Sequence, residues 1–159
     1  MKPNQRTKVL LQRDIAVQNA TSFTPVPSDQ QFERWVSAAL REHGDAELLI
    51  RLVDRQESRQ LNARYRHQNK ATNVLSFPAD LPEEVGLALL GDIIICAPIV
   101  AEEARAQHKT AEAHWAHLTI HGILHLLGHD HEAEEEASAM ESLETRILQS
   151  LGFPGPYNY

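Results

Sequence analysis

This sequence of 159 residues is poor in cysteine and in long apolar runs. Cys96 has no second cysteine to pair with, so an intramolecular disulfide is impossible and a reducing compartment fits the chain. We expect Cys96 to be a small buried side chain. The N-terminal residues lack the apolar core of a signal peptide, and no uncharged apolar run approaches the roughly 20 residues of a membrane span. We therefore expect a soluble cytoplasmic protein without a membrane partner.

Basic residues are also in deficit. The formal net charge is −7, which by itself argues against nucleic acid, because phosphate binding uses clustered Lys and Arg. The distribution changes this argument. Residues 51–70 carry six basic side chains against two acidic ones, whereas residues 132–144 carry six glutamates and no base. Residues 51–70 are thus free to present a basic face, although a solvated helix surface is the commoner meaning of such a run.

The patterns predict a chain with both strands and helices. The length suits one domain over residues 1–159. Period-two or continuous apolar patterns predict four strands, at 8–17, 46–54, 72–78 and 89–97. Helical stripes and start signals predict five helices, from Ser28 to before Gly44, from Asp54 to Arg66, from Pro98, from Thr110 to Leu127 and from Glu132 to Leu151. We expect capping boxes at Ser28/Gln31 and Asp54/Glu57 and a helix cap at Thr110. The expected fold is an α+β or α/β sandwich with a mixed sheet.

Histidine is unusually concentrated. Six of the nine histidines fall between positions 114 and 131, and His114, His117, His121 and His125 share one stripe of the helix expected there. A single histidine on a half-apolar helix face is more often a core residue than a metal ligand. Two histidines at i and i+4 can both reach one Zn²⁺ at about 2.0 to 2.1 Å, and both His117/His121 and His121/His125 have this spacing.

The residues after the stripe favour the second pair. Gly128 can end the helix in the left-handed conformation, and the reversal can bring His131 back toward His121 and His125. Three imidazoles with an open fourth position are typical of catalytic zinc, so we predict one Zn²⁺ held by His121, His125 and His131. His117 is then a neighbour that packs against or orients a ligand. Asp130 either orients an imidazole or is an ordinary loop residue.

Gly122 shapes the expected chemistry. The spacing HxxxHxxGxxH of residues 121–131 matches the metzincin proteases, but Gly122 stands where those enzymes carry their catalytic glutamate. Glycine inside a helix costs roughly 1 kcal/mol relative to alanine, so it indicates that a substrate or an adjacent strand approaches closely. A phosphodiester fits better than a peptide, because zinc activates water and polarises a phosphoryl oxygen. An arginine from the basic segment can stabilise the phosphate oxygens.

Three stretches of the sequence together resemble a known family. HGILHLLGHDH, LNARYRHQNKATNVLSFP and LLGDIII are similar to the YbeY family of bacterial endoribonucleases, the rRNA maturation factors, over about residues 46–151. The resemblance implies a single α+β domain with a mixed sheet and zinc on His121, His125 and His131. It also implies a functional arginine at Arg66, in the YR that precedes TNVLSFP. His129 departs from the family, which commonly has tyrosine there.

The resemblance further implies metal-dependent cleavage of single-stranded RNA. The implied roles are maturation of the 3′ end of small-subunit rRNA and ribosome quality control, with the small ribosomal subunit and its proteins as partners and no DNA substrate. The spacing alone would favour a solvated Arg66 at a helix end.

Two other functions compete with the endoribonuclease. A metallopeptidase would need its carboxylate from elsewhere, with Asp92 and Glu132 as candidates, and Gly122 counts against it. A ribosome assembly factor would use the histidines for a structural metal only, and chelation would then unfold the protein. The sequence leaves open the general acid and base, the cleavage sequence, the oligomeric state and the physiological metal, since nickel and iron accept the same ligands.

Overall fold

The computed structural model describes residues 12–82, 88–130 and 132–157, which build one mixed four-stranded sheet with five helices. The strands lie in the order β1-β2-β4-β3. The strands β1, β2 and β4 run parallel, and β3 pairs with β4 in the antiparallel sense at the edge of the sheet. The bounds are Arg13–Asn19 for β1, Ala46–Val53 for β2, Val74–Pro78 for β3 and Leu89–Cys96 for β4. The predicted α+β class and mixed sheet are confirmed.

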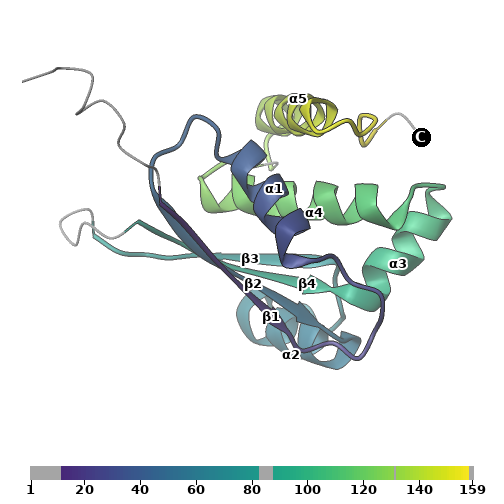
Figure 1. Ribbon diagram of the computed structural model, residues 1–159. Coiled ribbons are helices and arrows are strands. Elements are labelled where there is room, and N and C mark those ends of the chain that lie inside the picture. Colours follow the sequence, from purple (N-terminus) through teal and green to yellow (C-terminus); the bar gives the residue numbers. More distant parts are fainter. Residues whose placement is uncertain (1–11, 83–87, 131, 158–159) are drawn as a thin grey trace, which may run out of the picture.

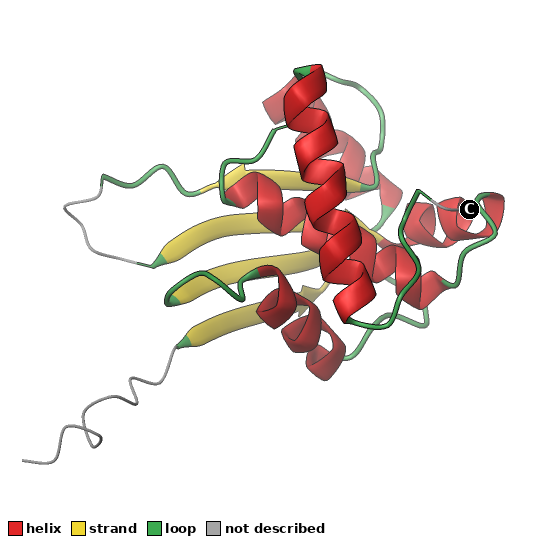
Figure 2. Ribbon diagram, turned by 90° about the horizontal axis from the view of Figure 1, so that it is seen from above, coloured by secondary structure: helices red, strands yellow, loops and turns green. Residues whose placement is uncertain are grey.

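The helices cover the two faces of the sheet unequally. Helices α1, α4 and α5 lie on one side and α2 on the other, while α3 follows directly from β4 (Figure 1). Seen from above, the helices of the larger layer cross over the strands (Figure 2). The bounds are Asp29–Ala39 for α1, Arg55–Arg66 for α2, Ala97–Ala106 for α3, Ala111–Leu126 for α4 and Glu134–Ser150 for α5.

Each side of the sheet has its own apolar core. The larger core lies between the sheet and the helix layer and includes Phe32, Trp35 and Trp115, whose rings meet edge to face. The smaller core lies under α2 and consists of Val53, Leu75, Ile94 and Cys96, with Leu61, Phe77 and Ile99 packed against it. Cys96 is buried there as a free thiol, as predicted. The site described below is built where the larger helix layer meets the edge strand β3.

The helix caps that the sequence predicts are partly confirmed. Ser28 and Gln31 form the expected capping box at α1, and the Thr110 hydroxyl accepts the Ala113 N–H at the start of α4. Asp54 is the N-cap residue of α2 as predicted, but its carboxylate makes no cap hydrogen bond to α2 and instead accepts from Thr21 and Ser22. These partners come from the loop after β1, which only the tertiary fold brings close.

The strand predicted at 8–17 is shifted. In the described part of the chain β1 runs from Arg13 to Asn19, and residues 8–11 lie outside the described residues. Within the described residues, no helix is both long and apolar enough to cross a membrane.

Candidate metal centre and cleft

Helix α4 carries the histidine stripe as predicted. All four histidines of the stripe, His114, His117, His121 and His125, lie within Ala111–Leu126. The other positions of α4 are mostly apolar and buried, so the helix is anchored on the larger core. The stripe faces α3 and α5 at its start and opens to solvent at its end. Each histidine therefore has a different environment.

His121 and His125 direct the same ring nitrogen toward each other. Their Nε2 atoms are 3.1 Å apart, and the rings meet nearly at right angles with centroids 4.6 Å apart. Two nitrogens bound to one tetrahedral zinc at about 2.05 Å stand roughly 3.3 Å apart. The separation of the two Nε2 atoms thus suits a shared metal ion.

The other nitrogen of His121 is held by a buried carboxylate. Nδ1 of His121 lies 2.6 Å from Oε2 of Glu144 on α5, and the Tyr157 hydroxyl donates to Oε1 of the same carboxylate at 2.6 Å. Glu144 is fully buried. Burial alone would raise the pKa of Glu144, but the nearby His117 ring and the hydrogen bonds with His121 and Tyr157 outweigh it and hold this pKa well below its ordinary range. The ionised carboxylate keeps the proton of a neutral His121 on Nδ1, so Nε2 presents a lone pair.

His117, His121 and Glu144 also form a compact group that could hold a metal ion. Their possible ligand atoms all lie within 4.8 Å of one another, and Nε2 of His117 is 3.5 Å from Oε2 of Glu144. The 2.6 Å contact between His121 and Glu144 is a hydrogen-bond distance, shorter than two ligands of one ion adopt. Burial lowers the pKa of His117 despite the opposing effect of Glu144, which favours a neutral ring there.

His114 belongs to the interior rather than to the cleft. It is 3% exposed, and its Nε2 lies 2.8 Å from Oε1 of Glu103 on α3. Asn73, just before β3, donates to the same carboxylate. The hydrogen bond with His114, more than that with Asn73, lowers the pKa of Glu103 in spite of its partial burial. His114 thus ties α4 to α3.

The turn after α4 forms as predicted. Gly128 adopts a positive φ of 99°, and its N–H and that of His129 donate to carbonyls of the last helical turn. His131, the third predicted ligand, lies outside the described residues. Asp130 and Glu132 on either side of it line the same cleft as His121 and His125. Of the two carboxylates considered for a peptidase, Glu132 is therefore in the cleft, whereas Asp92 is not among its lining residues.

Gly122 is required by the approach of the sheet. A Cβ at this position would stand 2.9 Å from Cγ2 of Ile93 and 3.2 Å from Oγ of Ser76. The Ser76 hydroxyl donates to the Gly122 carbonyl at 3.1 Å. Of the two reasons considered for this glycine, the adjacent strand is the one the geometry supports. A glutamate here would collide with β3 and β4, so the protease arrangement does not fit this helix.

Arg66 reaches the cleft from the opposite layer. It is the last residue of α2, and its Nη2 donates to the Ser76 carbonyl of the edge strand at 2.6 Å. Its guanidinium also lies 5.2 Å from the centre of the Phe77 ring. Arg66, His121 and His125 line one open cleft of about 510 Å³. The structure therefore brings together the predicted arginine and the two described histidines, which are more than fifty positions apart in the chain.

The basic segment is partly neutralised. Arg51 forms a bidentate ion pair with Glu57, and Arg55 pairs with Glu102 on α3. The surplus of positive charge predicted for residues 51–70 is therefore carried by their second half, where residues 58–70 contain four basic side chains and no acid.

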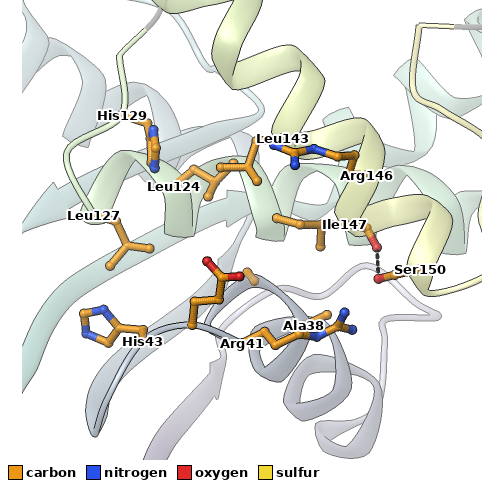
Figure 3. Close-up of a pocket in the computed structure, with 12 residues that line it drawn as sticks. Ala38, Arg41, His43, Leu124, Leu127, His129, Leu143, Arg146, Ile147 and Ser150 are labelled. Atoms are coloured by element: carbon orange, nitrogen blue, oxygen red, sulfur yellow. Dashed lines mark hydrogen bonds between the residues drawn. The ribbon is translucent and has the colours of Figure 1, made fainter.

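His129 lies in a different hollow. It lines a groove of about 440 Å³ between α1, α4 and α5, together with Arg41, His43 and Arg146 (Figure 3). Figure 3 shows its ring above Leu124 and Leu127, which close the apolar wall of this groove. His129 is thus separated from the cleft of His121 and His125 by the body of α4.

Sequence reasoning missed Glu144 and Tyr157. The six glutamates of residues 132–144 entered the sequence argument only as negative charge, but Glu144 occupies the apolar stripe of α5 with Met140, Ile147 and Leu148. A glutamate at a core position of an amphipathic helix is the signal that could have identified it. Tyr157 gave no such signal, because it lies in the irregular tail after α5.

Together, the mixed sheet and the histidine cleft define an α+β protein with a candidate metal centre beside a guanidinium. The family model described as "Endoribonuclease YbeY" matches residues 16–152, which is most of the chain. The chain therefore belongs to the YbeY endoribonuclease family, whose members are hydrolases that cleave RNA. The predicted family is confirmed.

A solved structure shares this fold. The chain is similar to a protein from Thermotoga maritima known from its solution structure, with 27% sequence identity and a TM-score of 0.56. The similarity covers 87% of this chain and 91% of the Thermotoga protein. It therefore extends over the whole fold rather than over the histidine motif alone.

Proposed function

We propose that this endoribonuclease is zinc-dependent and selective for single-stranded RNA, with residues 1–159 acting as one domain in the cytoplasm. Its proposed roles are maturation of the 3′ end of small-subunit rRNA and ribosome quality control, in contact with the small subunit and its proteins and without a DNA substrate. The observation that supports this best is the single cleft that Arg66 shares with His121 and His125. A guanidinium beside two imidazoles matches the needs of a phosphodiester, which presents anionic oxygens next to the metal.

One zinc ion would be held by His121, His125 and His131. Support comes from the 3.1 Å separation of the two described Nε2 atoms and from the contact between Nδ1 of His121 and Glu144, which favours the tautomer that binds a metal through Nε2. His131 follows the tight turn at Gly128, which directs the chain back toward α4. When bound, zinc lowers the pKa of water and polarises a phosphoryl oxygen. Glu144 then acts through His121, as carboxylates commonly do behind a ligating histidine.

Arg66 would bind the non-bridging oxygens of the scissile phosphate. The Ser76 carbonyl accepts one of its N–H groups, and a guanidinium has five. The bond to β3 therefore restricts the side chain to the cleft side of the edge strand while leaving N–H groups for the substrate. Such a preset donor stabilises developing charge without having to reorganise during the reaction.

The decisive experiment is cleavage of a labelled single-stranded RNA by purified protein with and without a chelator. We expect chelation, His125→Ala and Arg66→Ala each to reduce cleavage at least 100-fold. Matched controls are His129→Ala, from the neighbouring groove, and Arg105→Ala, an exposed arginine on α3. Both controls should retain cleavage within about threefold.

The same samples separate the competing functions. Circular dichroism should show that chelation leaves the core folded, because the apolar core is built without the histidines that face the cleft. Unfolding on chelation, together with cleavage that persists in both site variants, would indicate a contaminating nuclease and a structural metal. That result would favour an assembly factor over an enzyme.

A further inference from the structure

An exposed cluster of two arginines and two aromatic rings lies beside the cleft. We call Arg64, Tyr65, Arg66 and Phe77 the arginine–aromatic cluster. The rings of Tyr65 and Phe77 have centroids 5.3 Å apart and meet at 67°. The guanidinium of Arg64 lies 5.2 Å from the Tyr65 centroid, and that of Arg66 lies 5.2 Å from the Phe77 centroid. The cluster therefore offers aromatic surface and positive charge within one small area.

Of the two rings in the cluster, Phe77 is anchored on the protein and Tyr65 is accessible to solvent. Phe77 packs against the smaller core under α2, so its position is set by β3. Tyr65 is 49% exposed, so much of its ring is accessible to a ligand. Arg64 and Arg66 are exposed as well. An aromatic ring anchored from below and open above is the arrangement on which an unpaired base stacks.

The edge strand separates this cluster from the cleft and Arg66 connects them. Successive residues of a strand point to opposite faces, so Phe77 faces α2 while Ser76 faces α4, where it bonds Gly122. Arg66 crosses the edge of β3 to the Ser76 carbonyl and lines the cleft. Among the residues that the structure describes, β3 has a strand neighbour only on its β4 side, so a ligand can pass over its other edge from the cluster to the histidines.

Charge favours RNA as the occupant and sets its direction of approach. Residues 58–70 carry Arg59, Arg64, Arg66 and Lys70 without an acidic residue. The far side of the cleft is lined by Asp130 and Glu132, and the first turn of α5 adds three more glutamates. A polyanion is attracted to the first region and repelled by the second. An RNA strand would therefore enter the cleft from the side of α2 and β3.

We propose that the arginine–aromatic cluster is a base-stacking subsite for the RNA substrate. One unpaired base stacks on Tyr65, Arg64 and Arg66 contact the adjacent phosphates, and the strand crosses the edge of β3 into the histidine cleft. This inference rests on the proposed function and adds a physical basis for single-strand selectivity. Bases in a duplex are already stacked on one another and are not available to Tyr65.

The test compares substitutions that remove the ring with substitutions that keep it. Binding of a fluorescent single-stranded RNA of about 12 nucleotides is followed by anisotropy, with chelator present to stop cleavage and the fold checked by circular dichroism. We expect Tyr65→Ala to weaken binding about 5- to 100-fold and Tyr65→Phe to change it less than about twofold. Leu81→Ala, which removes another exposed apolar side chain, is the matched control and should leave binding unchanged.

Further measurements distinguish base stacking on Tyr65 from a general effect of charge. Tyr65→Ala should leave the affinity for duplex RNA unchanged, and in cleavage assays on the zinc-loaded protein it should raise KM with kcat within about threefold. Equal losses for single-stranded and duplex RNA would overturn stacking and leave a general electrostatic effect. If Tyr65→Ala binds RNA as tightly as the wild type while Arg66→Ala binds it more weakly, the Tyr65 ring only packs against its neighbours and the stacking subsite is wrong.

Failure of this subsite is distinguishable from failure of the proposed function. If the wild-type protein cleaves RNA in a chelator-sensitive manner while Tyr65→Ala matches it in affinity and KM, only the subsite is wrong. If the wild-type protein neither cleaves nor binds single-stranded RNA, both proposals are wrong.

Discussion

The histidines of α4 share one spacing but lie in two environments. Toward the start of the helix, His114 and His117 are enclosed, with Glu103 and Glu144 as their carboxylate neighbours. Toward its end, His125 and the Nε2 atom of His121 face an open cleft that also contains Arg66. The environment of each histidine on α4 therefore depends on what packs against it. At the enclosed end carboxylates lie against His114 and His117, whereas at the open end the Nε2 atoms of His121 and His125 face each other in the cleft.

Replacing one histidine from each half tests this division most directly. We expect His125→Asn to weaken zinc binding more than 100-fold, because it removes a ligand. His117→Asn should weaken it less than about tenfold, since its ring lies on the side of Glu144. Competition with a chromophoric chelator measures both affinities. A larger loss in His117→Asn than in His125→Asn would place the ion in the buried group of His117, His121 and Glu144.

Glu144→Gln should have the next largest effect. The amide keeps the shape of the side chain but loses the charge that orients His121, and loss of such a partner typically costs 10- to 100-fold in metal affinity. The buried hydrogen bonds to Glu144 should also be weakened, lowering the free energy of unfolding by about 1–3 kcal/mol. Glu136→Gln, an exposed position on the same helix, serves as control in chelator competition and urea denaturation. Unchanged zinc affinity in Glu144→Gln would show that the carboxylate does not act through His121.

Tyr157→Phe should have a smaller effect on the same contact. The phenol hydroxyl is one of several donors to Glu144, so its removal should weaken zinc binding less than about tenfold. Burial and the bond to Glu144 raise the pKa of Tyr157, which keeps the hydroxyl protonated and able to donate. The control is Tyr65→Phe, in which an exposed hydroxyl is removed far from Glu144. Equal zinc affinities for Tyr157→Phe and Tyr65→Phe would show that the hydroxyl of Tyr157 does not contribute to zinc binding.

The smallest expected effect concerns the pH dependence of stability at the enclosed end of the stripe. The pKa of Glu103 is held below its ordinary value of 4.5, chiefly by the hydrogen bond with His114. A lowered carboxyl pKa contributes stability above the ordinary value and loses it as the pH falls through the folded value. Urea denaturation should thus show a steeper loss of stability below about pH 4.5 for the wild type than for Glu103→Gln. Parallel curves would mean that Glu103 contributes nothing to acid unfolding.

Much of the fold could be predicted because its signals are local. Apolar periodicity located the five helices and four strands, and the caps at Ser28 and Thr110 formed as expected. Asp54 shows where local reasoning fails, since its carboxylate prefers hydroxyls from a loop more than thirty positions away. Strand order could not be predicted for the same reason, because the pairing of β2 with β4 depends on contacts between segments that are distant in the sequence.

The candidate site also combines features that local sequence predicts with contacts between distant segments. That His121 and His125 lie one turn apart on a single helix and that Gly128 ends it follows from local sequence, because helical spacing and a positive φ at glycine are properties of a few consecutive residues. The bond between Glu144 and one nitrogen of His121 and the crossing of β3 by Arg66 depend on the packing of the whole chain. Those contacts join segments that are distant in the chain, and their geometry follows from how α2 and α5 pack on opposite sides of the sheet.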